Sequence, residues 1–171
     1  MRPETKTIVH RILIHPGASR AYKQWTFSRF EELAEQLVAR GFEVVWITQN
    51  TDDKNRLPAS VIQKTPSDLK SFVNDLASAE LFVDNNSGPM NLANALGIPS
   101  VIFSGPSPEK WAPYWHREHV SNLRVPDLRC QPCDPVSGPV NACQNCESPM
   151  ACMNGISVDF VIQEIERLLK S

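Results

Sequence analysis

Residues 82–103 constrain the fold of this chain more than any other segment. They read Phe-Val-Asp-Asn-Asn-Ser-Gly-Pro-Met-Asn-Leu-Ala-Asn-Ala-Leu-Gly-Ile-Pro-Ser-Val-Ile-Phe. An apolar run precedes Asp84, a polar loop follows it, and Pro89 suits the first turn of a helix because its missing N–H has no helical partner. A second apolar run begins at Ser100. The segment therefore predicts strand, loop, short helix and strand, the alternation that is typical of a parallel sheet.

The same alternation continues along the chain and predicts an α/β fold, a Rossmann-like parallel sheet with flanking helices. With 171 residues, 42% of them hydrophobic, the chain is long enough for one substantial core. We expect strands over residues 11–15, 42–48, 59–63, 81–84 and 100–103, and helices over residues 27–40, 89–96 and 157–169, with another helix beginning at residues 65–66.

Residues 104–149 contain eight of the 14 prolines. Proline interrupts both helices and central strands, so we expect this stretch to be mostly irregular and to wrap over the sheet rather than extend it.

Two loops predict an anion site. A loop that ends a parallel strand and opens a helix is where doubly wound folds bind phosphate, so the backbone amides around Gly88 are candidate ligands. A second such loop follows residues 11–14, where Gly17 permits close approach, Ser19 supplies a hydroxyl and Lys23 a point charge. The alternatives are a simple tight turn at the first loop and, at the second, a solvated basic turn with Trp25 packed beneath it.

All five cysteines lie in the proline-rich part of the chain and just after it. Cys130 and Cys133 form one CxxC pair, Cys143 and Cys146 form another nine residues later, and Cys152 follows. Two such pairs can present four thiolates to a tetrahedral ion, usually zinc, although iron also suits them. Disulfides and unliganded thiols are the alternatives. We therefore predict a structural metal bound in an irregular segment over residues 126–153.

Three ordered motifs resemble glycosyltransferase family 9, the heptosyltransferases that use ADP-heptose. The family's Pro-Gly-Ala-Ser loop, Lys-x-Trp and amphipathic helix correspond to residues 14–41. Its Asn-Asp-Ser-Gly-Pro-Met-His-Leu-Ala pattern corresponds to residues 85–93. Its Phe-Gly-Pro and Trp-x-Pro correspond to residues 103–106 and 111–113. The resemblance covers almost the whole chain and implies the C-terminal, donor-binding half of a GT-B glycosyltransferase.

The resemblance also implies the site residues. The donor would be bound by residues from both loops: Ser19, Lys23, Asn86, Ser87, Gly88, Pro89, Met90 and Asn91. Where the family carries Asp and His, this chain has Asn86 and Asn91, which keep hydrogen-bonding capacity but lose an ionisable group. The catalytic residue is expected on an N-terminal domain absent from this chain, so residues 1–171 would form a single nucleotide-sugar-binding domain that binds without turnover.

For the cysteines, the family patterns suggest Cys130, Cys133, Cys143 and Cys152, whereas the spacing alone favours Cys146 as the fourth ligand. We follow the spacing and expect Cys130, Cys133, Cys143 and Cys146, with Cys152 as the possible substitute. Related autotransporter heptosyltransferases carry a four-cysteine iron finger, which this segment resembles. No cofactor is expected for catalysis.

The expected partners are an ADP-heptose-like nucleotide sugar, the N-terminal domain, and a lipopolysaccharide core or protein acceptor. A net charge of −2 gives no electrostatic reason to expect nucleic acid, and no apolar run is long enough for a transmembrane segment, so we expect a cytoplasmic protein. One alternative is a catalytically degenerate, metal-stabilised scaffold or protein-binding module, which the two asparagines favour. Another is a flavodoxin-like nucleotide-binding domain.

Overall fold

The computed structural model describes residues 10–48, 57–133 and 148–170. Its described part contains one six-stranded sheet in the order β3-β2-β1-β4-β5-β6, and every neighbouring pair is parallel. The strands are β1 (Arg11–His15), β2 (Glu43–Ile47), β3 (Ile62–Lys64), β4 (Leu81–Asn85), β5 (Ser100–Phe103) and β6 (Val120–Leu123). The predicted parallel α/β fold is confirmed.

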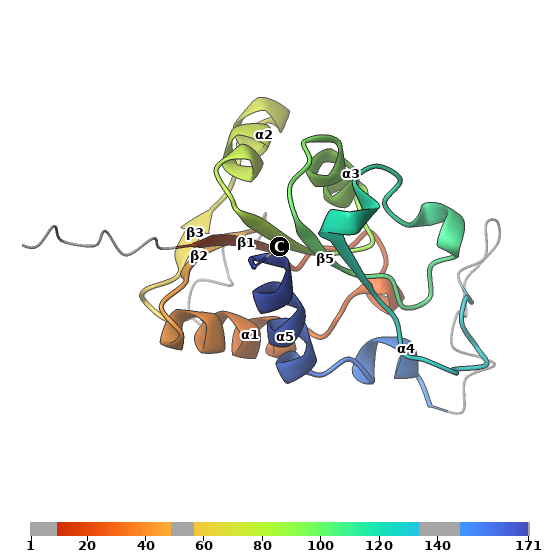
Figure 1. The fold of residues 1–171 in the computed structure, drawn as a ribbon. Helices are drawn as coiled ribbons and strands as arrows, with labels where there is room; N and C mark the ends of the chain where they lie inside the picture. Colours follow the sequence, from red (N-terminus) through yellow and green to blue (C-terminus); the bar gives the residue numbers. More distant parts are fainter. Residues whose placement is uncertain (1–9, 49–56, 134–147, 171) are drawn as a thin grey trace, which may run out of the picture.

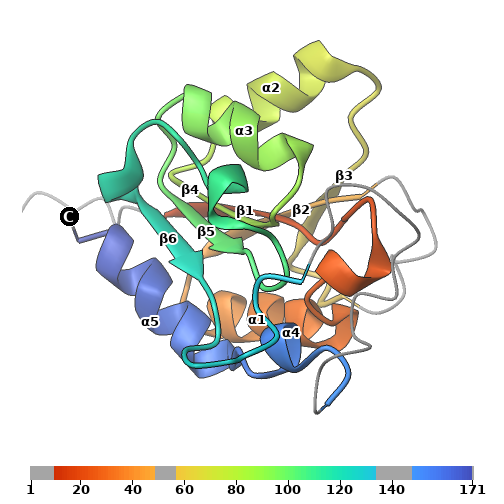
Figure 2. The same cartoon turned by 90° about the vertical axis from the view of Figure 1, so that its right-hand side faces the viewer.

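Helices cover both faces of the sheet (Figures 1 and 2). On one face lie α1 (Phe27–Ala39), α4 (Ala151–Asn154) and α5 (Val158–Leu168), and on the other lie α2 (Leu69–Ala77) and α3 (Gly88–Ala95). The period of two along β1 divides its side chains between two cores: Ile12 and Ile14 pack with α1 and α5, and Leu13 packs with α2 and α3. Both faces of the central strands are therefore buried, as a doubly wound sheet requires.

Trp25 anchors the first loop to the core beneath it. Its indole stacks on Phe103 with ring centroids 4.4 Å apart, meets Phe30 edge-on at 5.0 Å, and donates from Nε1 to the carbonyl oxygen of Ile156 at 3.0 Å. Trp25 therefore packs beneath the loop, as the alternative interpretation of this loop expects, and this packing does not exclude a ligand site above.

The proline-rich stretch extends the sheet, so the prediction that it would only wrap over the sheet is wrong. Val120–Leu123 pair in parallel with β5, and Ser121 and Leu123 face inward. The connection from β5 to β6 is irregular apart from the 3-10 turns η3 (Glu109–Trp111) and η4 (Arg117–His119). A four-residue strand between prolines has too short an apolar pattern to stand out in the sequence.

Helix α2 begins later than the sequence suggested. Asp68, not the Thr65-Pro66 pair, is its N-cap: the Asp68 carboxylate accepts from the Ser71 amide at 2.7 Å, and the Ser71 hydroxyl accepts from the Asp68 amide at 3.2 Å. This capping box satisfies two amides of the first turn reciprocally.

The strand order reverses between β1 and β4. From β1 the chain proceeds outward through β2 and β3, and from β4 it proceeds the other way through β5 and β6. Connections therefore leave the carboxyl ends of β1 and β4 in opposite directions and open a crevice between them, the usual ligand position in such sheets. Among the described helices, none is long and apolar enough to span a bilayer.

Candidate functional site: a loop-lined cavity at the reversal of strand order

A cavity of about 590 Å³ opens at the carboxyl ends of β1 and β4. The loop after β1 supplies one wall through Pro16, Gly17, Ala18 and Ser19, and the start of α3 supplies another through Ser87, Gly88 and Pro89. The two loops that the sequence singled out therefore face one space, as predicted. The rest of the lining comes from His15, Gln24, Phe27, Ile47 and Thr48.

Asn85 fastens the two loops to each other. This fully buried residue ends β4, and its side-chain amide donates to the carbonyl oxygens of Pro16 at 2.9 Å and Gly17 at 3.0 Å. Its side-chain oxygen accepts from the backbone amide of Trp25 at 2.9 Å. One side chain thus bonds three backbone groups of the first loop and fixes the position of that loop relative to the sheet.

A second buried contact joins the same strands. Asp84 is fully buried, and its Oδ1 lies 2.8 Å from Nδ1 of His15, its direct neighbour in the β1–β4 register. Its Oδ2 accepts from the Ser87 hydroxyl at 2.5 Å. Burial raises the pKa of the Asp84 carboxyl, while the hydrogen bonds and charge of His15 and the Ser87 hydroxyl oppose that rise.

The Ser87 hydroxyl bonds to Asp84 and not to helix α3. Ser87 is the N-cap of α3, but its side chain makes no capping hydrogen bond; its hydroxyl donates to Asp84. The first amides of α3 are therefore not capped by that hydroxyl and face the end of the helix, where partial positive charge favours an anion. A Cβ added at Gly88 would meet nothing within 4 Å, so there is room for a ligand close to the backbone.

The predicted donor residues occupy different positions around the cavity. Ser19, Ser87, Gly88 and Pro89 line it, with Ser19 exposed. Met90 is buried at 2% exposure, so its side chain is part of the protein interior.

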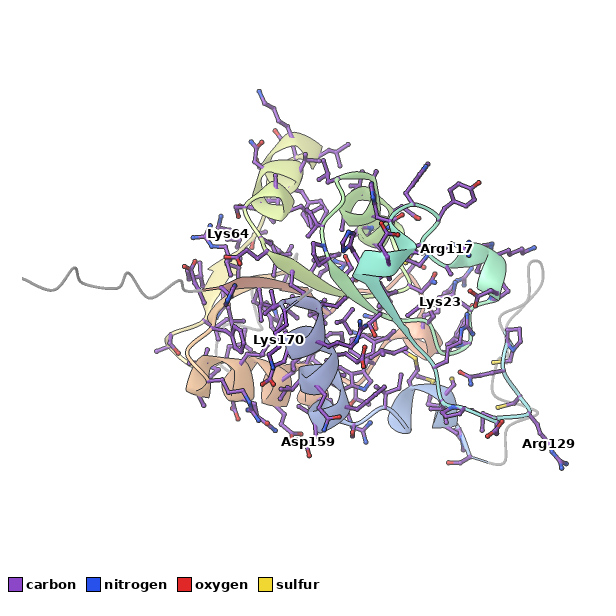
Figure 3. All side chains as sticks on the ribbon, viewed as in Figure 1. Lys23, Lys64, Arg117, Arg129, Asp159 and Lys170 are labelled. Atoms are coloured by element: carbon purple, nitrogen blue, oxygen red, sulfur yellow. The ribbon has the colours of Figure 1, made fainter. Side chains whose placement is uncertain are left out.

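Asn86, Asn91 and Lys23 lie outside the lining. Asn86 is buried, and its amide donates to Ser104 Oγ at 3.1 Å and to the carbonyl oxygen of Trp111 at 3.0 Å. Asn91 is exposed on α3. The Nζ atom of Lys23 lies 4.5 Å from the centre of the Trp111 ring. Figure 3 shows Lys23 beside the loop that follows β5. For Lys23 to bind a phosphate in the cavity, its ammonium would have to leave the indole face.

A second hollow of about 330 Å³ adjoins the first and shares His15, Ile47 and Pro89 with it. Its other walls come from the start of α2: Pro66, Ser67, Asp68, Leu69 and Phe72. The helical spacing of Leu69 with Phe72 and Leu76 predicts that Leu69 faces inward, but it is 65% exposed. Together the two hollows offer an amide-rich space beside one whose wall includes Leu69 and Phe72.

The cysteines of the described residues belong to a different part of the molecule. Cys130 and Cys133 are half-buried and Cys152 is buried. Figure 3 shows Arg129, which precedes Cys130, projecting from the edge of the molecule. The Cys133 amide donates to the carbonyl oxygen of Pro106 at 3.0 Å, and a Cβ on the neighbouring Gly105 would lie 3.4 Å from the Cys152 sulfur.

The cysteine-bearing segments thus meet on either side of Gly105–Pro106. Cys143 and Cys146 lie outside the described residues. In the described ranges no group of three or more His, Cys, Asp or Glu side chains is arranged to hold a metal ion, so the predicted metal stays a prediction.

Comparison with known proteins agrees with this geometry. Residues 2–137 match the family model described as glycosyltransferase family 9 (heptosyltransferase). The chain belongs to this family. Lipooligosaccharide heptosyltransferase 2 of Campylobacter jejuni is 26% identical over 176 residues, which cover 92% of this chain and 50% of the relative. This family 9 chain therefore spans about half the length of that relative.

Solved structures of two heptosyltransferases have the same fold. ADP-heptose lipopolysaccharide heptosyltransferase II of E. coli superposes with a TM-score of 0.71 at 24% identity, over 94% of this chain and 46% of the other. The iron-containing dodecameric heptosyltransferase TibC, solved with ADP-D-β-D-heptose, superposes with a TM-score of 0.70 at 21% identity, over 96% of this chain and 46% of the other. At these identities the likeness shows the fold alone.

Sequence reasoning missed three residues that shape the cavity: His15, Asp84 and Asn85. All three lie in the quoted motifs: the patterns predict His15 and Asp84 as strand ends and Asn85 as the first residue of the polar loop. A buried strand that ends in two adjacent polar residues, Asp84 and Asn85, was the available signal, because buried polar side chains require partners.

Proposed function

We propose that this chain is the donor-binding half of a heptosyltransferase and binds the ADP moiety of a nucleotide sugar. The enzyme would transfer heptose or a related sugar to a lipopolysaccharide or protein acceptor. The observation that carries the proposal is the cavity between two phosphate-type loops at the reversal of strand order. Family membership supports the reaction type, and relatives crystallised with ADP or ADP-heptose support the donor.

The two hollows suggest how the donor would lie. The diphosphate would contact the amides at the start of α3 and the loop containing Gly17 and Ser19, where partial positive charge and room for close approach coincide. The base would occupy the adjoining hollow against Ile47 and Phe72, because bases bind against apolar and aromatic surfaces.

The chemistry would require a second domain. An acceptor hydroxyl must lose a proton as it attacks the sugar, and we propose that the base for this step lies on an N-terminal domain outside this chain. The present domain would stabilise the negative charge that develops on the ADP leaving group. Neither role needs a metal, so no catalytic cofactor is proposed, and residues 1–171 alone would bind without turnover.

We also propose a structural zinc or iron in the cysteine segment. Cys130 and Cys133 would supply one thiolate pair and Cys143 a third ligand. The spacing favours Cys146 as the fourth, but the burial of Cys152 beside Gly105, next to the Cys133 segment, supports Cys152. The thiolates would bind the ion and tie the segment to the loop after β5.

The degenerate scaffold and the flavodoxin-like domain have less support. The curated relatives are heptosyltransferases, and the loops of this chain retain the cavity despite Asn86 and Asn91. Because nucleotide sugars are made and used in the cytoplasm, a donor-binding role would place the protein there.

Isothermal titration with ADP, ADP-heptose and UDP tests the donor proposal. We expect selective binding of the two adenine compounds. On binding, the Lys23 ammonium would leave the Trp111 ring for a phosphate oxygen, so Lys23→Ala should weaken binding about tenfold because this charge-assisted contact is lost. Lys170→Ala, which removes the same charge near the amino ends of β1 and β2, is the matched control and should bind as the unmodified chain does. Equal binding of UDP, or none of any nucleotide, would contradict the proposal.

A further inference from the structure

His15 lies where the two hollows meet. It ends β1, lines both spaces, and keeps 19% of its side chain exposed. On its outer side the ring meets Phe72 edge-on, with centroids 6.3 Å apart. A ligand that extended from one hollow into the other would therefore pass this imidazole.

The buried carboxylate of Asp84 orients the ring. Nδ1 faces Oδ1 of Asp84 at 2.8 Å, and the other carboxylate oxygen already accepts from Ser87. An ionised carboxylate accepts hydrogen bonds only, so the proton of this contact belongs to Nδ1. The second ring nitrogen, Nε2, has no hydrogen-bond partner within the described residues.

Nε2 faces the loop that lines the cavity. A Cβ placed on Gly17 would lie 2.8 Å from Nε2, a separation that side chains do not adopt, so residue 17 must be glycine for the ring to lie here. The imidazole fits against the loop only because residue 17 has no side chain. Nε2 therefore lies beside the loop backbone that we propose contacts the diphosphate.

Acidic groups lie around the ring. From β4 the buried Asp84 carboxylate faces it directly, and from the start of α2 the Asp68 carboxylate lines the adjoining hollow. The described residues that contribute to the lining from β2, the loop after β1 and the start of α3 are uncharged: Ile47, Thr48, Gly17, Ala18, Ser19, Ser87, Gly88 and Pro89. A phosphate bound here would therefore depend on backbone amides, hydroxyl groups and Nε2 of His15.

We propose that His15 binds a phosphate oxygen of the donor through Nε2, with Asp84 as the positioning residue that orients the ring through Nδ1. The inference rests on the proposed function, because it needs a diphosphate in the cavity. With the Nδ1 proton directed at Asp84, Nε2 can donate only when both ring nitrogens carry a proton, so the contact requires the imidazolium and donor affinity is expected to fall as the pH rises.

The test is titration of the 171-residue chain with ADP-heptose between pH 5.5 and 8, because the diphosphate of a nucleotide sugar has no ionisation of its own there. For the unmodified chain we expect affinity to fall about tenfold across this range. His15→Gln, which can keep a neutral donor near Nε2, and His15→Asn, which can keep the donor toward Asp84 only, should both bind weakly and without pH dependence.

Two further variants separate this role from a structural one. Lys23→Ala should weaken binding at every pH, but the fall in affinity with rising pH should persist, since lysine stays charged over the whole range. Asp84→Asn should weaken binding, because an amide in place of the carboxylate removes the charge-assisted contact that orients the ring through Nδ1. Circular dichroism of each variant checks that the fold is retained.

The outcomes distinguish the two proposals. If His15→Gln and His15→Asn bind with the affinity and slope of the unmodified chain, the role of His15 is wrong and the donor proposal stands. If the unmodified chain binds no adenine nucleotide at any pH, both proposals fall.

Discussion

Asn85 shows how one side chain decides whether the cavity has the right shape. It bonds the carbonyl oxygens of Pro16 and Gly17 and the amide of Trp25, so it connects β4 to both ends of the first loop. An amide is the side chain that can donate twice and accept once in this position. Residue 85 must therefore both donate and accept hydrogen bonds. A carboxylate of the same shape can only accept them.

Asn85→Asp is expected to destabilise the chain by about 2–3 kcal/mol and to abolish measurable ADP binding. The substitution removes both donors and places a buried carboxylate against two carbonyl oxygens, which costs the desolvation of an unpaired group. Urea denaturation gives the free energy of unfolding, and calorimetric titration gives the affinity.

Asn74→Asp is the matched control, since Asn74 is exposed on α2 and the chemical change is identical. It should alter the free energy of unfolding by no more than about 0.5 kcal/mol. Equal effects of the two substitutions would mean that the Asn85 contacts contribute nothing specific.

The junction of α5 with β6 illustrates how a helix secures an unexpected strand. Glu164 on α5 accepts from the Ser121 hydroxyl on β6 at 2.7 Å and from Arg167 Nε at 3.0 Å. These hydrogen bonds and the Arg167 charge hold the pKa of the Glu164 carboxyl below its usual value, although partial burial opposes them. The contact joins the edge strand to the helix that covers it, while the apolar face of α5 supplies most of the packing.

Glu164→Gln is expected to lower the free energy of unfolding by about 1 kcal/mol at neutral pH, a modest figure because the carboxylate is partly exposed. A carboxyl whose pKa is lower in the folded state contributes stability above its unfolded value of 4.5, and that contribution is lost as the pH falls through the folded pKa. The difference between the two proteins should therefore shrink toward zero below about pH 3.

Urea denaturation as a function of pH measures this difference. Glu166→Gln is the control, because Glu166 is 42% exposed and its nearest cation, Arg40, is 3.9 Å away. A Glu164→Gln effect that stayed constant from pH 3 to pH 7 would point to packing rather than charge.

The assembly of the domain depends on segments remote in sequence that meet at Gly105–Pro106. The Cys133 segment bonds to Pro106 on one side, and Cys152 with Met153 packs against Gly105 on the other. A metal bound by these cysteines would connect the proline-rich stretch and α4 to the carboxyl end of β5. It would thus stabilise the loop after β5, whose Trp111 carbonyl is bonded to Asn86.

We expect purified chain to contain about one equivalent of zinc or iron by elemental analysis, and removal with a chelator to lower the thermal midpoint by several degrees. Cys130→Ser and Cys152→Ser should each lose the metal, and Cys146→Ser should retain it. If Cys152→Ser kept its full metal content and Cys146→Ser lost the metal, the fourth ligand would be Cys146, as the spacing favours. A purified chain that contains no metal, and whose thermal midpoint does not change with a chelator, would contradict the proposed metal site.

The parallel sheet and its flanking helices were readable from the sequence because they depend on local patterns. Apolar runs, helical spacing and loop residues identified five of the six strands, and the residues of two phosphate-type loops. The family followed from the same motifs, since they retain their order along the chain. Short-range regularity is a property of neighbouring residues and needs no knowledge of the fold.

Tertiary structure decided what those local patterns could not contain. His15 and Asp84 are 69 residues apart, and Asn85 is 69 residues from Pro16; they meet only because β1 pairs with β4 in a particular register. Strand β6 exists because β5 offers an unpaired edge to a short run that has little strand signal of its own. Pairing and burial depend on partners distant in sequence, and these long-range contacts turned two loops into one cavity.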